Sequence, residues 1–144
     1  MATEHYVLAA PPEEPRLRAL WLQHAAGFIL MEDVRQAAID QLDPRLSAEE
    51  RAVAIDAVDA TMYQLMAVID GVRRGLTNSQ YHVDLHLIVQ LQRCDANQTS
   101  VPSVLEHLDV RDGDGMCMGI YGWLRGDYGA RPIVDPIVDP IVES

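Results

Sequence analysis

The hydrophobic period of this sequence changes abruptly between Gly71 and Ser79. Before this point, apolar residues recur at alternating steps of three and four, the spacing of the packed face of a long helix. After it, apolar residues alternate with mostly polar ones, which is the pattern of a half-buried strand. The first series is Ile55, Val58, Met62, Leu65, Ile69 and Val72, and the second is Val83, Leu85, Leu87, Val89 and Leu91. The chain therefore divides into a helical half and a sheet half.

Two long helices are predicted in the first half. The first covers residues 16–41, and Pro44 follows its end because proline cannot continue a helix. Ser47 with Glu50 three residues later forms a capping box, which opens the second helix, predicted over residues 48–74. The short connection requires the two helices to pack antiparallel as an αα-hairpin.

Three antiparallel strands are predicted in the second half, over residues 81–93, 104–111 and 116–124. The Asp-Gly-Asp-Gly sequence at residues 112–115 is a strong reverse-turn signal between the last two strands. The predicted fold is therefore α+β. It is a single domain over residues 1–130 in which two long antiparallel helices pack on a small three-stranded antiparallel sheet.

Residues 131–144 form an extended tail with a repeat of period four. Pro-Ile-Val followed by an acidic residue occurs three times, beginning at Pro132, Pro136 and Pro140. Proline in every unit excludes a helix and an interior strand. One interpretation is a mobile repeat expansion. The other is an arm that lays its Ile-Val pairs along a groove of its own or of a neighbouring subunit.

The chain is strongly acidic, and all its cationic side chains are of one kind. Its formal net charge is −11, and all 11 basic residues are arginines. The absence of lysine excludes Schiff-base chemistry and a Walker-type phosphate site. Nucleic-acid binding is not expected, because that affinity comes mostly from cationic contacts with phosphates.

Location is predicted from the cysteines and from the lack of targeting segments. Cys94 and Cys117 are too few for a disulfide scaffold, although a bond between neighbouring strands stays open. The first 15 residues carry three glutamates and do not resemble a signal peptide. The apolar stretches are shorter than the ~20 residues of a membrane span. We therefore expect a cytoplasmic protein with reduced thiols and no membrane association.

His82, Asp84 and His86 occupy alternate positions of the first predicted strand and so share one face. Imidazole and carboxylate groups are metal ligands, but the two histidines would lie about 13 Å apart along an extended strand. A metal site would use two of these residues with a ligand from elsewhere, such as His107 or Asp114. The alternative is a solvated outer face, and no metal or other cofactor is predicted.

The segment from Met116 to Gly129 is the predicted binding site. Glycines recur there at steps of four and three, which would place them on one side of a helix. Because each costs a soluble helix up to about 1 kcal/mol, a bent strand and loop is predicted instead. Aromatic and arginine side chains on such a surface favour protein contacts. The predicted binding residues are Tyr121, Trp123, Arg125, Asp127 and Tyr128. The alternative is that Tyr121 and Trp123 cover the core of a small sheet.

His24 lies on the apolar face of the first predicted helix, near Phe28. A histidine in such a place is usually a core residue with a local hydrogen-bond partner. We therefore expect it to affect the pH dependence of stability.

Two functions from different classes fit these observations. The favoured one is a non-enzymatic, bacterial-type acidic module that binds a more basic protein, in the manner of immunity proteins or inhibitors, with its charge speeding encounter. The other is a metal-dependent or acid–base enzyme that uses His82, Asp84 and His86. The second predicted helix also has more apolar surface than one helix and a small sheet require, which is compatible with a homodimer.

Overall fold

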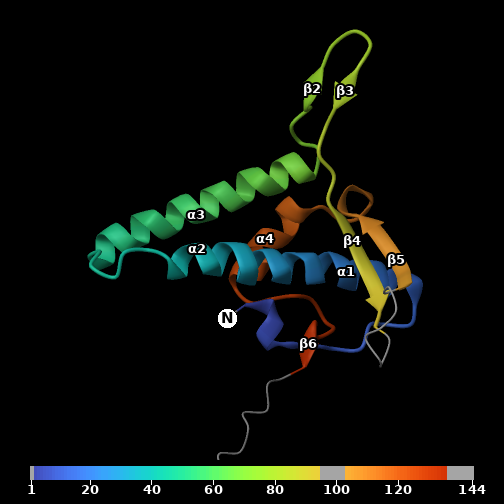
Figure 1. Ribbon diagram of the computed structural model, residues 1–144, viewed down its shortest axis with the longest axis horizontal. Coiled ribbons are helices and arrows are strands. Elements are labelled where there is room, and N and C mark those ends of the chain that lie inside the picture. Colours follow the sequence, from blue (N-terminus) through green and yellow to red (C-terminus); the bar gives the residue numbers. More distant parts are fainter. Residues whose placement is uncertain (1, 95–102, 136–144) are drawn as a thin grey trace, which may run out of the picture.

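The computed structural model describes residues 2–94 and 103–135 of the chain. Its class is α+β, as predicted, with the helices forming the body and small two-stranded antiparallel sheets lying around them (Figure 1). The order of elements is a mixture of helices and strands rather than the predicted helical half followed by a sheet half. A short strand precedes the two long helices, and a third helix, near the end of the described chain, replaces the last predicted strand.

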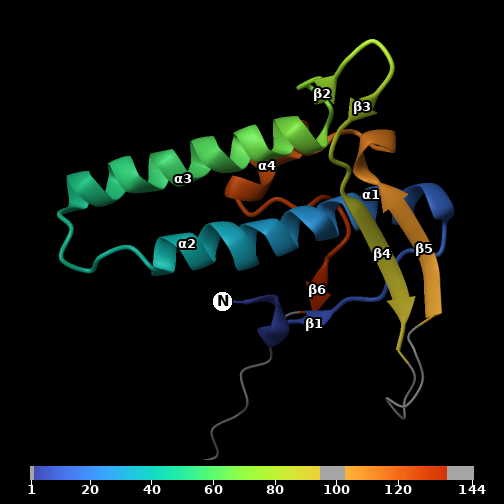
Figure 2. The ribbon, with the colours of Figure 1, turned by 45° about the horizontal axis from the view of Figure 1, so that its top comes forward.

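The two long helices are confirmed. The first is one rod of 26 residues made of α1 (Pro15–Ile29), a π-helical segment (Leu30–Gln36) and α2 (Ala37–Asp40). The second is α3 (Ala48–Ile69), which lies antiparallel beside it (Figure 2). The capping box is present, because Ser47 accepts a hydrogen bond from the Glu50 amide while the Glu50 carboxylate accepts one from the Ser47 amide.

α3 ends at Ile69, earlier than the predicted residue 74. Gly71 has a φ of +77°, a left-handed conformation that stops a helix and that glycine adopts without strain. The Arg111 guanidinium donates to the last carbonyls of the helix, those of Val68 and Ile69. Val72, which the pattern placed on the packed face, is consequently 69% exposed.

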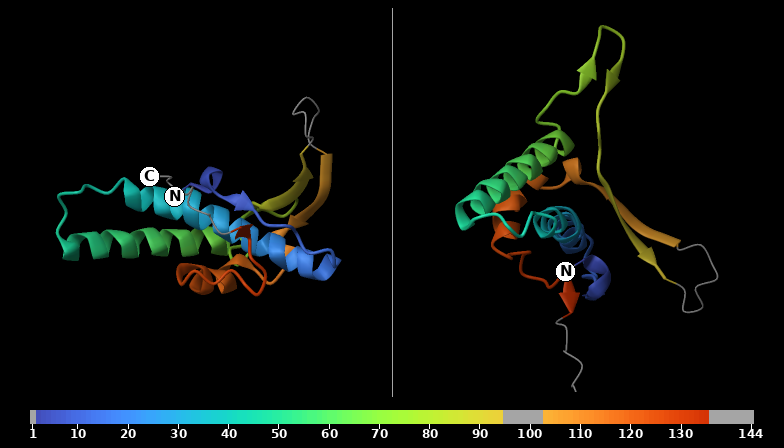
Figure 3. Two further views of the ribbon diagram at one scale, coloured as in Figure 1. Left: turned by 90° about the horizontal axis from the view of Figure 1, so that it is seen from below. Right: turned by 60° about the vertical axis from the view of Figure 1, so that its left-hand side comes forward.

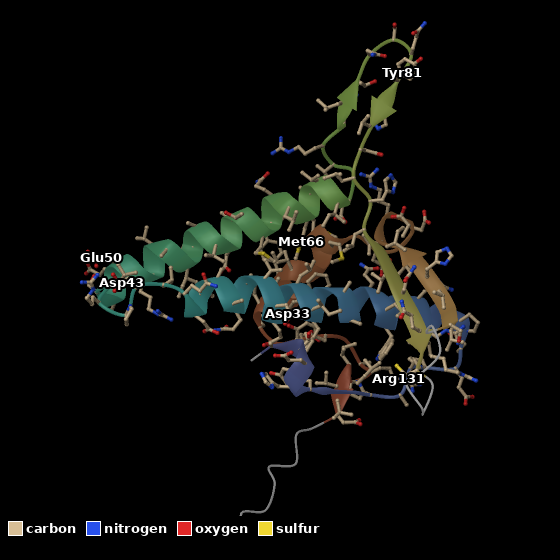
Figure 4. All side chains as sticks on the ribbon, in the orientation of Figure 1. Asp33, Asp43, Glu50, Met66, Tyr81 and Arg131 are labelled. Carbon is tan, nitrogen blue, oxygen red and sulfur yellow. The ribbon has the colours of Figure 1, made fainter. Side chains whose placement is uncertain are left out.

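The predicted three-stranded sheet is wrong, because the strands form three separate pairs. β4 (Ile88–Arg93) pairs with β5 (Ser103–Asp109), which agrees with the predicted strand at 104–111. β2 (Leu76–Thr77) pairs with β3 (His82–Val83) in a hairpin that projects from the body, with Tyr81 near its tip (Figures 1 and 4). β1 (Val7–Leu8) pairs with β6 (Val134–Asp135).

The long strand predicted over residues 81–93 is interrupted between β3 and β4. At this point the Arg111 guanidinium donates to the Asp84 carboxylate at 2.6 Å and to the Leu85 carbonyl at 2.7 Å. Of these acceptors, the Leu85 carbonyl is a main-chain group, and its hydrogen bond comes from a side chain rather than from a neighbouring strand. The projecting hairpin and the β4–β5 pair are therefore separate units joined by a short segment fastened to Arg111.

The third predicted strand, at residues 116–124, is instead helix α4 (Met116–Leu124). Its first turn is capped by Asp70, whose carboxylate accepts from the Met116 and Cys117 amides at 2.7 Å each. The glycines allow this helix to pack. A Cβ at Gly119 would overlap the Trp123 indole, so only glycine leaves room for the ring. α4 covers one side of the helical pair (Figure 3).

Two apolar clusters form the core. The larger lies between α1, α3 and α4, and the smaller between α1, β4 and residue 133. The fully buried Met66 sits in the larger cluster (Figure 4). The members of the larger cluster are Ala26, Met31, Met62, Met66, Ile69, Val110, Met116, Ile120 and Trp123, and those of the smaller are Trp21, Leu22, Ala25, Phe28, Leu91 and Ile133.

The first unit of the tail repeat packs on the body. Ile133 is only 5% exposed, and the Val134–Asp135 strand pairs with β1, where a short strand is present at Val7–Leu8. The units that begin at Pro136 and Pro140 lie outside the described residues.

Candidate functional site

The predicted binding segment does not form one surface, because α4 turns its side chains in different directions. Trp123 is 3% exposed and lies in the larger core cluster, whereas Tyr121, two residues earlier, is 62% exposed. Tyr128 is half-buried and packs edge-on against Phe28, with ring centroids 5.1 Å apart. Burial raises the pKa of Tyr128 to about 12. Of the three predicted aromatic residues, Tyr121 is thus the one that faces solvent.

The two charged residues of the segment are both exposed. Arg125 is the C-terminal capping residue of α4. Asp127 accepts a hydrogen bond from the Gly129 amide at 3.0 Å and so shapes the turn after the helix. Both follow Leu124, the last residue of α4.

Trp123 is held by a hydrogen bond to His24. The indole Nε1–H donates to His24 Nδ1 at 3.0 Å, so the neutral imidazole carries its proton on Nε2. Desolvation lowers the pKa of His24 below its ordinary value of 6.5, opposed by the charges of Asp127 and Asp114. His24 is therefore a partly buried histidine with a hydrogen-bond partner, but the partner comes from a distant part of the chain rather than from the neighbouring residues that the sequence predicts.

We expect the stability of the protein to fall as the pH drops below 6.5. The unfolded chain protonates His24 near pH 6.5, while the folded chain resists protonation because the charged imidazole could not accept from Trp123. Unfolding therefore takes up a proton in this range, and stability rises with pH until it levels above 6.5. His24→Gln, which keeps a hydrogen-bond acceptor but does not titrate, should flatten the profile of urea midpoints between pH 5 and 7.5.

Tyr121 lies beside Tyr63 of α3, with ring centroids 6.2 Å apart and planes tilted by 44°. The two rings border an open, mainly apolar hollow of about 290 Å³ between α3 and α4. We call this the tyrosine hollow. Its lining residues are Asp59, Ala60, Tyr63, Gln64, Ile120, Tyr121 and Leu124.

The stretch of α3 beside the tyrosine hollow carries few charges, and both of them lie on the face of the hollow. Between Ala52 and Ile69, α3 carries only two charged residues, Asp56 and Asp59. Asp59 is paired with Arg35, at 2.5 Å between Oδ1 and Nε. Among the described residues, α3 is the one helix that is long enough and apolar enough to cross a membrane. Core helices of soluble proteins also pass this test of length and composition. Val53, which is 70% exposed and lies seven residues before Ala60, extends the apolar part of this face.

Sequence reasoning missed Tyr63, because it lies outside the apolar series that predicted the packed face of α3. The available signal was a large aromatic side chain in a helix that has more apolar residues than one packed face can contain. Its partner Tyr121 could not be inferred, because the contact depends on the packing of α4 against α3.

His82, Asp84 and His86 do come together, at the base of the projecting hairpin. The Asp84 carboxylate contacts His82 Nε2 at 3.3 Å and His86 Nε2 at 3.1 Å, and His86 Nδ1 contacts Asp109 at 2.5 Å. The Arg111 guanidinium beside Asp84, followed by the two histidines, lowers the pKa of that carboxyl to about 2.

The arrangement does not suit a metal ion. Within the described residues, no group of three or more histidine, cysteine, aspartate or glutamate side chains could hold one. The Arg111 guanidinium donates to the Asp84 carboxylate, and a fixed cation beside this carboxylate opposes the binding of a second one. His107 lies opposite Gln90 in the β4–β5 register and does not join the group. The Asp114 amide donates to Gln23, in another part of the fold.

Cys94 and Cys117 are both free. Burial, together with the neighbouring Asp70 carboxylate, raises the pKa of Cys117 to about 11, so this thiol stays protonated and unreactive near neutral pH.

Comparison with known protein families, with curated proteins and with solved structures gives no match.

Proposed function

We propose that the protein is a non-enzymatic, acidic interaction module that binds a more basic protein partner through the tyrosine hollow. The observation that carries the proposal is the pair of solvent-facing tyrosines, Tyr63 and Tyr121, on either side of an apolar hollow. Tyrosine is among the side chains most enriched at the energetic centres of protein interfaces, where its ring enters an apolar contact and its hydroxyl stays near water.

The charge distribution supports a basic partner. The chain as a whole carries a net charge of −11. Such a field attracts a cationic protein and repels anionic ones. Asp59, the carboxylate that lines the hollow, is already paired with Arg35. Immunity proteins and inhibitors that use acidic charge to bind a basic target provide the analogy, and we propose the same broad functional class for this chain. A cytoplasmic location stays a prediction.

The enzymatic alternative has less support. The Asp84 carboxylate, which would have to act as a base or ligand, is paired with Arg111 and has a pKa of about 2. A carboxylate this acidic is a poor general base near neutral pH. We infer that His82, Asp84 and His86 fasten the hairpin to the body instead.

The proposal predicts that alanine at either tyrosine weakens the complex about 30-fold or more, the usual loss at an interface hot spot. The test is capture of partners from a lysate of the source organism by the full chain, identification by mass spectrometry, and titration of the purified partner. Tyr63→Ala and Tyr121→Ala should each lose the partner. Retention should also weaken as salt rises, because the encounter is electrostatic.

Tyr81→Ala is the matched control, since Tyr81 is also exposed but lies on the projecting hairpin (Figure 4). It should bind the partner as the natural chain does. Equal loss in all three variants, or binding that salt does not affect, would contradict the proposal. Light scattering separates the remaining alternative, a homodimer through this face, because the single chain is 16.0 kDa.

A further inference from the structure

We propose that the groove between α1 and β1 is a docking site for the motif Pro-Ile-Val followed by an acidic residue, and that the three tail units are interchangeable occupants. The structure contains one occupant, the unit Pro132–Asp135. The chain continues directly from it into two more units, beginning at Pro136 and Pro140. The chain therefore carries three copies of a ligand beside a site that holds one.

The first unit is bound by main-chain contacts and one buried side chain. The Trp21 indole donates to the Pro132 carbonyl at 3.0 Å, and the Ala9 amide donates to the Ile133 carbonyl at 2.9 Å. Ile133 enters the apolar cluster that contains Trp21, Leu22 and Phe28. The ladder then pairs Leu8 with Val134 and Val7 with Asp135.

Each of these contacts depends on a feature that all three units share. The carbonyl that Trp21 contacts belongs to proline, whose missing N–H is not required here. The buried side chain is isoleucine in every unit, and the ladder pairs backbone atoms that do not depend on side-chain identity. The only difference between the units is Glu143, which takes the place of Asp135 in the third. Asp135 lies at the exposed end of the docked unit.

Exchange of one unit for the next carries a small entropic penalty. Placing the second or third unit in the groove lengthens the loop that leads from Gly129 by four or eight residues. Each doubling of a flexible loop reduces the population of the closed form only about threefold. Because the units are tethered to their own groove, the effective concentration favours the same chain over a second copy. The first unit is therefore the main occupant and the others are substitutes.

The test removes units from the full chain by replacing the motif isoleucine with serine. The three variants are Ile133→Ser, the double variant Ile137→Ser with Ile141→Ser, and the triple variant. The readouts are hydrogen-exchange protection of the Ala9 amide and the NMR shift of the Trp21 indole N–H, both of which donate to the docked unit. The double variant should match the natural chain, because the first unit is intact.

The decisive comparison is between Ile133→Ser and the triple variant. With two intact units left, Ile133→Ser should lose only about three- to tenfold of the Ala9 protection, while the triple variant should lose at least 100-fold. If the triple variant fails to fold while Ile133→Ser folds, the proposal is supported, because the two remaining units are then what keeps Ile133→Ser folded. Equal loss in the two would overturn it. Protection of Ile133→Ser that disappears on dilution would also overturn it, because the substitute would then come from a second copy.

Discussion

Trp123→Ala is expected to lower the free energy of unfolding by about 3–5 kcal/mol, the usual cost of truncating a large buried aromatic side chain. Trp123, a residue of α4, is almost completely buried, packs beside Gly27 of α1 and donates its indole proton to His24 of the same helix. The substitution would leave a cavity where the two helices meet and an imidazole nitrogen without its partner. Urea unfolding followed by circular dichroism measures the loss.

Two further variants of α4 show how much of the lost stability comes from the Trp123 ring and how much from its N–H donor. Tyr121→Ala, two residues away on α4, should change stability by no more than ~0.5 kcal/mol, because its side chain faces solvent. Trp123→Phe keeps much of the ring but removes the donor, and should fall between the two. A Trp123→Ala loss as small as that of Tyr121→Ala would show that the indole does not join the helices.

The parts of the fold that the sequence predicted correctly are those encoded by neighbouring residues. The capping box at Ser47 and Glu50 needs only residues one turn apart, and the apolar spacing of α1 and α3 is a property of each helix alone. The turn around Gly113 likewise follows from local backbone preference. Each of these signals would be the same in an isolated peptide.

α4 was missed because the decisive contacts come from distant parts of the chain. The intrinsic propensity of a segment rich in glycine opposes a helix. Asp70, at the end of α3, supplies the cap for its first turn, and the ring of Trp123 lies over Gly119 and reaches Gly27 on α1. Tertiary contacts thus outweigh local propensity, and no spacing rule within residues 116–129 contains that information.

The candidate sites illustrate the same limit. His82, Asp84 and His86 do lie together, but the predicted strand on which they alternate is interrupted after Val83. The charge of the group is determined by Arg111, more than twenty residues later. The predicted binding segment included Tyr121, which is exposed, but the ring beside it, Tyr63, belongs to another helix. Residue types can nominate a site, but the neighbours that determine its charge and exposure come from the fold.

Gly27→Ala is expected to destabilise the protein by about 2 kcal/mol, although alanine is the better helix former. A Cβ at this position would overlap the five- and six-membered rings of Trp123, and a rigid indole in a packed core cannot move aside without displacing α4. Overpacking of this kind costs typically 1–3 kcal/mol or more, which exceeds the gain of about 1 kcal/mol in helix propensity. Urea unfolding again gives the measurement.

A double-mutant cycle identifies the indole as the cause. In the Trp123→Ala background the space beside Gly27 is vacant, so the added methyl group meets no ring and retains only its helix-forming advantage. Gly27→Ala should therefore become neutral or stabilising by up to about 1 kcal/mol in that background. If it destabilises both backgrounds equally, the glycine is needed for some reason other than the close approach of Trp123. The sign change, more than either single loss, tests whether α4 is positioned by one indole between two glycines.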